Sequence, residues 1–168
     1  WSLRIRYRFR IREKDNAGKT ALMHEQTQRG RIALAYTAAS WSCRSQIDLA
    51  VSSYLKRSSG YMLTETGTWS PAAWLSLTAT AGYFHTSDFA SRIYVYERGP
   101  LYAFSFPSFY GRGMRCGLFA RADLSCRLMF ILRCSATRYF DRSTISSGLQ
   151  QIHSPMMSDL DIQLRWKF

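Results

Sequence analysis

The chain has 168 residues, of which 46% are apolar and 15% aromatic, and its mean hydropathy is -0.23. No apolar run approaches the roughly 18 residues that a membrane-spanning helix needs, which excludes a helical membrane protein. Lys and Arg total 23 against 11 Asp and Glu, so the net charge of +12 favours nucleic acid, an anionic lipid or an anionic solute as a partner.

The opening segment, LRIRYRFRIR over residues 3–12, alternates strictly between arginine and apolar side chains. A helix would spread the arginines around its whole surface, whereas a strand places alternate residues on opposite faces. The pattern therefore predicts a strand with one apolar face and one basic face. Because Trp1 already belongs to this pattern, we expect the chain to be the C-terminal portion of a longer protein. The basic face holds Arg4, Arg6, Arg8, Arg10 and Arg12.

Further segments that read as strands follow at residues 31–38, 43–52, 61–69, 74–84, 92–97, 101–106, 115–122 and 126–139. Most of them keep their apolar residues on one face, and we expect their charged residues on the other. The acids expected on that charged face are Asp48, Glu65, Asp159 and Asp161. The arginines expected there are Arg44, Arg115, Arg121, Arg127, Arg133 and Arg165. Four cysteines, without metal-site spacing, share the apolar parity and are expected to be free: Cys43, Cys116, Cys126 and Cys134.

The last ten residues, DLDIQLRWKF, repeat the opening alternation and end on an aromatic residue. About ten strictly alternating residues suit a tilted membrane-spanning strand. The segment resembles the C-terminal signal strand of bacterial outer-membrane β-barrels, which ends in Phe and is read by the barrel-assembly machinery. The resemblance implies an insertion signal formed by Leu160, Ile162, Leu164, Trp166 and Phe168.

The predicted connections alternate between short turns and longer polar loops. We expect turns at 39–43, 70–73, 97–100 and 122–125, and loops at 13–29, 53–60, 85–91, 107–113 and 141–158. Outer-membrane barrels have this asymmetry, with short periplasmic turns and long extracellular loops. The expected fold is all-β: an antiparallel up-and-down meander of about ten transmembrane β-strands, forming part of an outer-membrane β-barrel.

Three stretches besides the opening strand resemble one family: YERGPLYAFSFPSFYGRG, TRYFDRSTISSGLQQI and SDLDIQLRWKF. They are similar to the C-terminal barrel of Bacteroidota outer-membrane proteins often named for an N-terminal helix-hairpin-helix region. The resemblance spans most of residues 1–168 and implies that they are the last ten strands of a larger barrel. It supplies no catalytic residues, and the helix-hairpin-helix itself is absent from these residues.

We therefore expect an integral outer-membrane segment that is porin- or transporter-like and non-catalytic, with no cofactor or metal and an arginine-rich lumen. Expected partners are outer-membrane lipid and lipopolysaccharide, the assembly machinery and an anionic solute. The arginines select anions, pair with acids on strands outside these residues, or simply lie in a wet lumen. His24, His85 and His153 are expected in solvated loops.

Two alternatives remain: a soluble basic β-sheet protein that binds nucleic acid, and a barrel that takes part in DNA uptake. A nucleic-acid platform mixes aromatic and basic side chains on one face, whereas this sequence separates them. Closing ten strands into a barrel would crowd the arginines into a narrow lumen. We therefore expect a larger parent barrel, and an open, curled sheet or a strained closure for these residues alone.

Overall fold

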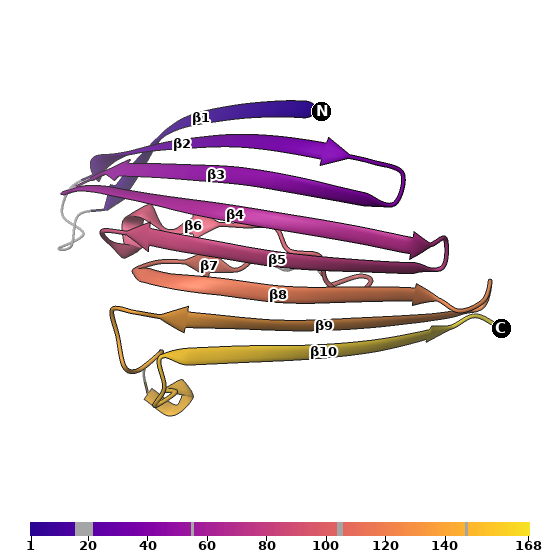
Figure 1. The fold of residues 1–168 in the computed structure, drawn as a ribbon. Helices are drawn as coiled ribbons and strands as arrows, with labels where there is room; N and C mark the ends of the chain where they lie inside the picture. The colour runs from indigo at the N-terminus through magenta and orange to yellow at the C-terminus, as the bar shows by residue number, and fades with distance from the viewer. Residues whose placement is uncertain (16–21, 55, 104–105, 147) are drawn as a thin grey trace.

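The computed structural model describes residues 1–15, 22–54, 56–103, 106–146 and 148–168, and its regular structure is all-β (Figure 1). Eight long strands form one sheet in the order β1-β2-β3-β4-β5-β8-β9-β10, and two short strands form a separate ribbon. The strands are β1 (Ser2–Asp15), β2 (Leu22–Thr37), β3 (Trp41–Ser53), β4 (Arg57–Ala72), β5 (Leu75–Thr86), β6 (Ile93–Tyr94), β7 (Ser108–Phe109), β8 (Arg112–Asp123), β9 (Leu128–Tyr139) and β10 (Met156–Trp166). Two single 3-10 turns, η1 (Phe89–Ser91) and η2 (Gly148–Gln150), interrupt the connections.

Every pair of neighbouring strands in the large sheet is antiparallel, which agrees with the predicted meander. Within the described residues, β1 pairs only with β2 and β10 pairs only with β9. The sheet is therefore open, with β1 and β10 at its two edges, as expected for these residues alone (Figure 1).

The prediction that residues 92–97 and 101–106 are two strands of the meander is wrong. β5 pairs directly with β8, with Ala81 opposite Cys116, and the described residues of the long 87–111 connection, 87–103 and 106–111, lie behind the sheet (Figure 1). Only the two-residue strands β6 and β7 pair within it. Pro100 and Pro107 lack the amide hydrogen that a ladder needs, which opposes a sheet strand here. Of the three aromatic residues predicted to point outward from the second strand, Tyr102 has a φ of 67° and Phe106 lies outside any strand. Phe104 lies outside the described residues.

Short turns and long connections still lie at opposite ends of the sheet. Two consecutive strands fewer leave the direction of all the other strands unchanged. Residues 38–40, 73–74 and 124–127 form short turns at the end of the sheet where both termini lie (Figure 1). The opposite end carries the long connections 87–111 and 140–155. We call these two ends the turn end and the loop end. The loops predicted at 13–29 and 53–60 are longer than the structure allows, because β1 runs to Asp15, β2 begins at Leu22 and β4 begins at Arg57.

A small apolar core joins residues 87–111 to the sheet. We call the face that they cover the inner face, and the opposite one the outer face. Phe84 is fully buried, with its ring centroid 5.1 Å from that of Phe109 and 5.6 Å from that of Tyr139. A Cβ at position 113 would lie 2.6 Å from the Phe84 ring, so the position has room only for glycine. The buried members of this core are Ala50, Met62, Phe84, Ile93, Val95, Phe109, Tyr139 and Ile145.

Replacing Phe84 with Ala should lower the free energy of unfolding by about 3–5 kcal/mol, because the cavity would open at the centre of this core. Urea unfolding of the protein in detergent micelles, followed by tryptophan fluorescence, measures the change. Phe140→Ala is the matched control, since Phe140 is 45% exposed and should cost about 1 kcal/mol or less. Equal losses in the two variants would contradict this placement of the core.

Candidate functional site

The arginines of β1 lie on the inner face of the sheet. Residues directly opposite each other in an antiparallel pair share a face. Arg6 lies opposite Arg31 and Arg8 opposite Arg29, whereas Ile5 lies opposite Ile32 on the outer face. The same register places Arg4, Arg10 and Arg12 on the inner face. Strand parity places Arg44, Arg115, Arg121, Arg133 and Arg165 there too.

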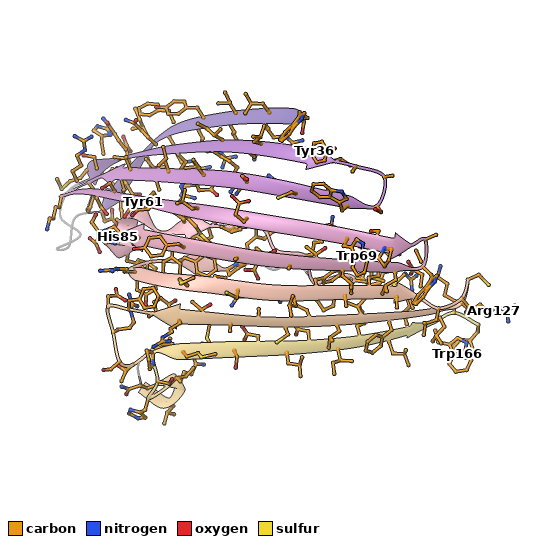
Figure 2. All side chains as sticks on the ribbon, viewed as in Figure 1. Tyr36, Tyr61, Trp69, His85, Arg127 and Trp166 are labelled. Atoms are coloured by element: carbon orange, nitrogen blue, oxygen red, sulfur yellow. The ribbon has the colours of Figure 1, made fainter. Side chains whose placement is uncertain are left out.

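Two charged residues lie elsewhere than predicted. Arg127 is exposed in the turn before β9, where the amides of Arg127 and Leu128 donate to the Ser125 hydroxyl (Figure 2). Glu65 lies on the outer face, because its neighbours in β4 point inward and it stands opposite Ser45. The Ser45 hydroxyl donates to Glu65 Oε2 at 2.8 Å. The prediction that both face inward is therefore wrong.

Glu97, which the sequence places in a turn, is instead the centre of an ion network on the inner face. Arg115, which is 4% exposed, donates to both of its carboxylate oxygens, at 2.9 and 2.8 Å. Arg133 bridges Glu97 Oε2 at 2.8 Å and Asp161 Oδ2 at 3.0 Å. Asp159 lies 3.7 Å from Arg115. We call these five residues the Glu97 network; it ties the 87–111 connection to β8, β9 and β10.

The charge of Glu97 is maintained by its two arginine partners. Burial alone would raise the pKa of Glu97, but the hydrogen bonds and positive charges of Arg115 and Arg133 outweigh it and hold that pKa below its usual value. A buried charge whose partner is removed is strongly unfavourable. The network therefore fixes the position of the 87–111 connection as long as Glu97 is ionised.

A second group of arginines, near the loop end, lacks such partners. We call Arg6, Arg8, Arg10, Arg12, Arg29 and Arg92 the basic cluster. In the described part of the chain, none of the six forms an ion pair, although neighbouring Arg31 pairs with Asp48 at 2.5 Å. Five of them line a cavity of about 250 Å³ together with Glu25, Thr27, Ala90 and Tyr94. A smaller cavity of about 130 Å³ adjoins it beside Arg6 and Arg31.

A polar cavity of about 320 Å³ lies between the middle of the inner face and residues 95–98. The hydroxyls of Thr64 and Ser135 are buried in the protein and have no protein partner. Buried polar groups of this kind are usually satisfied by water, and the cavity has room for it. Further hydroxyls and charges line the cavity: Thr66, Thr68, Thr78, Thr80, Arg44, Glu97, Arg98 and Arg133. The middle of the inner face is thus suited to water, whereas the part around Phe84 is covered by the apolar core.

The outer face is apolar between two bands of aromatic side chains. Tyr36, Trp69 and Trp166 lie toward the turn end, and Tyr61 and His85 lie toward the loop end (Figure 2). The side chains between these bands are mostly aliphatic and exposed, among them Ile32, Leu34, Ile47, Leu118, Leu160, Ile162 and Leu164. The outer face of β10 therefore presents the predicted insertion signal, and the Phe168 ring stacks on that of Trp166 with centroids 6.2 Å apart.

The histidines and cysteines do not form a reactive group. His24 and His85 lie on β2 and β5 rather than in loops, and His153 lies in the 140–155 connection. The cysteines are free: Cys43, Cys116 and Cys134 are exposed on the outer face, and Cys126 is exposed in the turn before β9. Among the described residues, no group of three or more His, Cys, Asp or Glu side chains is placed to hold a metal ion.

No protein-family model, curated protein or solved structure matches this chain. Within the described residues, no helix is long and apolar enough to cross a membrane. Sequence patterns do not identify Glu97, Arg92 or Tyr94 as site residues, because they predict sheet strands at 92–97 and 101–106 with a turn at 97–100 between them. Arg29 was missed because the alternation of β2 fades into polar residues before Arg31.

Glu97→Gln should lower the free energy of unfolding at neutral pH by about 3–5 kcal/mol, because the buried Arg115 would lose the carboxylate that accepts two of its hydrogen bonds. A depressed carboxyl pKa contributes stability above the ordinary pKa of the group, and this stability is lost as the pH falls through the depressed value. The unmodified protein should therefore lose stability toward acid more steeply than Glu97→Gln.

Urea unfolding at a series of pH values between neutral and acid measures both effects. Glu13→Gln is the control, since Glu13 is exposed on β1 and forms no ion pair with a described residue. It should leave stability and acid dependence close to those of the unmodified protein. The same acid dependence in Glu97→Gln and the unmodified protein would contradict the role given to Glu97.

Proposed function

We propose that this chain is a segment of an outer-membrane β-barrel, porin- or transporter-like and without catalysis. Its outer face contacts lipid, and its inner face lines a water-filled lumen that favours anions. The observation that carries the proposal is the separation of side chains in one sheet. Exposed aliphatic residues predominate on the outer face, while arginines, acids and hydroxyls predominate on the inner one outside the apolar core around Phe84.

The outer face supports contact with lipid. An exposed apolar surface that runs across eight strands is unusual for a protein surrounded by water. In a membrane barrel it is the expected surface, flanked by aromatic bands at the two interfaces. The long strands have 11 to 16 residues, which is enough to span the bilayer at a tilt.

The two edges of the sheet support incorporation into a closed barrel. Backbone groups in lipid must be hydrogen-bonded within the protein, which open edges do not allow. We propose that β1 and β10 pair in the membrane, either with each other or with further strands. The second arrangement gives the inner arginines a wider, wetter lumen, and it agrees with the resemblance to the larger helix-hairpin-helix-named barrels.

The inner face supports a selective passage rather than a plain structural wall. A wall with an excess of positive side chains raises the local concentration of anions. The 87–111 connection narrows the space in front of this wall and is held in place by the Glu97 network. The outer-face residues of β10 favour recognition by the barrel-assembly machinery, and lipopolysaccharide is the expected neighbour of the loop end.

Glu65 is a charged residue in the middle of the lipid-facing surface, whereas the other charged residues of that face lie near the loop end. Its carboxylate accepts a hydrogen bond from the Ser45 hydroxyl, which satisfies part of its hydrogen-bonding capacity. Acidic residues on the lipid face of barrels cost less than the roughly 2–4 kcal/mol found for Arg or Lys at the midplane. One partnered carboxylate is therefore compatible with a lipid-facing surface.

Substitutions at two neighbouring residues of β5 test whether the outer face contacts lipid or water. Ala79 lies on the outer face and Thr80 lines the inner polar cavity. Ala79→Arg should lower the free energy of unfolding in phospholipid vesicles by about 2–4 kcal/mol, because the charge would lie in lipid near the middle of the strand. It should also reduce the amount of protein in the outer-membrane fraction of expressing cells.

Thr80→Arg is the matched control, because it adds the same side chain to the face that we place in water. It should leave both measurements nearly unchanged. If the outer face were in water, Ala79→Arg would change stability by only about 0.5 kcal/mol. That result, together with recovery of the unmodified protein in a soluble fraction, would refute the proposal.

A further inference from the structure

We propose that the basic cluster is a discrete binding site for a compact phosphate-bearing anion, located on the inner face near the loop end. The inference deepens the proposed function and rests on it in one respect: the inner face must be open to water. It names a substrate class for the anion-favouring lumen. It also assigns a role to arginines that the Glu97 network leaves out.

The composition of the cavity points to an anion. Arg8, Arg10, Arg12, Arg29 and Arg92 line its 250 Å³, and Glu25 is its only acidic residue among the described ones. Glu25 itself pairs with Lys14 at 3.6 Å. So many guanidinium groups around one small space repel each other unless water or an anion separates them.

In the Glu97 network, on the same inner face, neighbouring arginines are neutralised by carboxylates. There Arg115 and Arg133 meet three carboxylates, those of Glu97, Asp159 and Asp161. In the basic cluster, the protein supplies no comparable counter-charge among its described residues. A negatively charged ligand would neutralise the arginines of the basic cluster, as the carboxylates neutralise those of the Glu97 network.

The arginine from the 87–111 connection is held in position before any ligand binds. Arg92 Nε donates to the Tyr94 hydroxyl at 2.6 Å, and Arg92 Nη1 donates to the Phe89 carbonyl at 3.1 Å. The Arg29 guanidinium carbon lies 5.1 Å from the centre of the Tyr94 ring, on the side of β2. The Tyr94 carbonyl in turn accepts from Arg31, which Asp48 holds. Groups placed in advance lose less entropy on binding.

The number of guanidinium groups around the cavity favours a polyanion such as phosphate over a singly charged anion. Guanidinium groups match phosphate oxygens with two parallel hydrogen bonds, and several of them favour a ligand with more than one negative charge. The bounded cavity suits a compact ligand such as pyrophosphate or a phosphate monoester rather than a long polymer. Its place near the loop end is where a solute entering the lumen would arrive first.

Titration calorimetry of the full chain in detergent micelles, with sodium pyrophosphate at low ionic strength, tests the site. We expect binding of one pyrophosphate per chain, weakening as salt is raised. Arg29→Gln and Arg92→Gln should each weaken binding by about 10- to 100-fold, the range for a lost hydrogen bond to a charged group. Arg4→Gln is the matched control, because Arg4 lies on the same strand and face as Arg8 but outside the cavity, and it should change affinity by less than about twofold.

A second measurement keeps the inference testable if a variant fails to fold. Pyrophosphate should raise the Tm of the unmodified protein, whereas sodium chloride at the same ionic strength should not, since only a ligand of the folded state stabilises it. Absence of both heat and a Tm shift overturns the site. Equal weakening by Arg4→Gln and Arg29→Gln overturns it too, in favour of a diffuse basic surface.

Nanodiscs with and without phosphatidic acid separate the two sources of phosphate. Unchanged pyrophosphate affinity in the two kinds of disc supports a soluble ligand. Weaker apparent affinity in the phosphatidic acid discs supports the phosphate site but assigns it to a lipid headgroup. The anion site can fail while Ala79→Arg still distinguishes lipid from water, so failure of this inference and failure of the proposed function are separate results.

Discussion

The two-residue period of a β-strand is the constraint on which the rest of this structure depends. It sends every side chain of the large sheet to one of two faces, and the sequence uses it to collect arginines on one face and aliphatic residues on the other. A shift of one residue in a single strand would exchange the two sets. The aromatic bands, the polar cavities and the arginine groups all follow from that one alternation.

The inner face then decides where the 87–111 connection lies. The connection is anchored at two points, by Phe109 against Phe84 in the apolar core and by Glu97 against Arg115 and Arg133. These anchors also place Arg92 and Tyr94 in front of β1 and β2. The 87–111 connection therefore neutralises Arg115 and Arg133 through Glu97, and it adds the positive charge of Arg92 to the basic cluster. The charge of the inner face is uneven along its length as a result.

Local patterns predicted the eight long strands and the face of most of their residues, because strand alternation depends only on near neighbours in sequence. They failed where the outcome depends on distant partners. RIYVYE at residues 92–97 has the residues of a strand, yet β5 finds its partner in β8 instead. Local patterns predict a turn at Glu97 because its partners lie 18 and 36 positions away along the chain. β2 begins at Leu22 rather than at residue 31 as predicted, since its polar first half is strand only through pairing with β1.

The native cysteines provide the most direct test of the claim that the outer face lies in lipid. Cys116 and Cys134 are exposed on the outer face in the middle of β8 and β9, and Cys126 is exposed in the turn between them. With the protein in phospholipid vesicles opened by freeze-thaw, a charged, water-soluble maleimide should modify Cys126 and spare the other two, as read by mass spectrometry of the digested protein. After denaturation, all three should react. Modification of Cys116 and Cys134 at the rate of Cys126 in the folded protein would contradict the account.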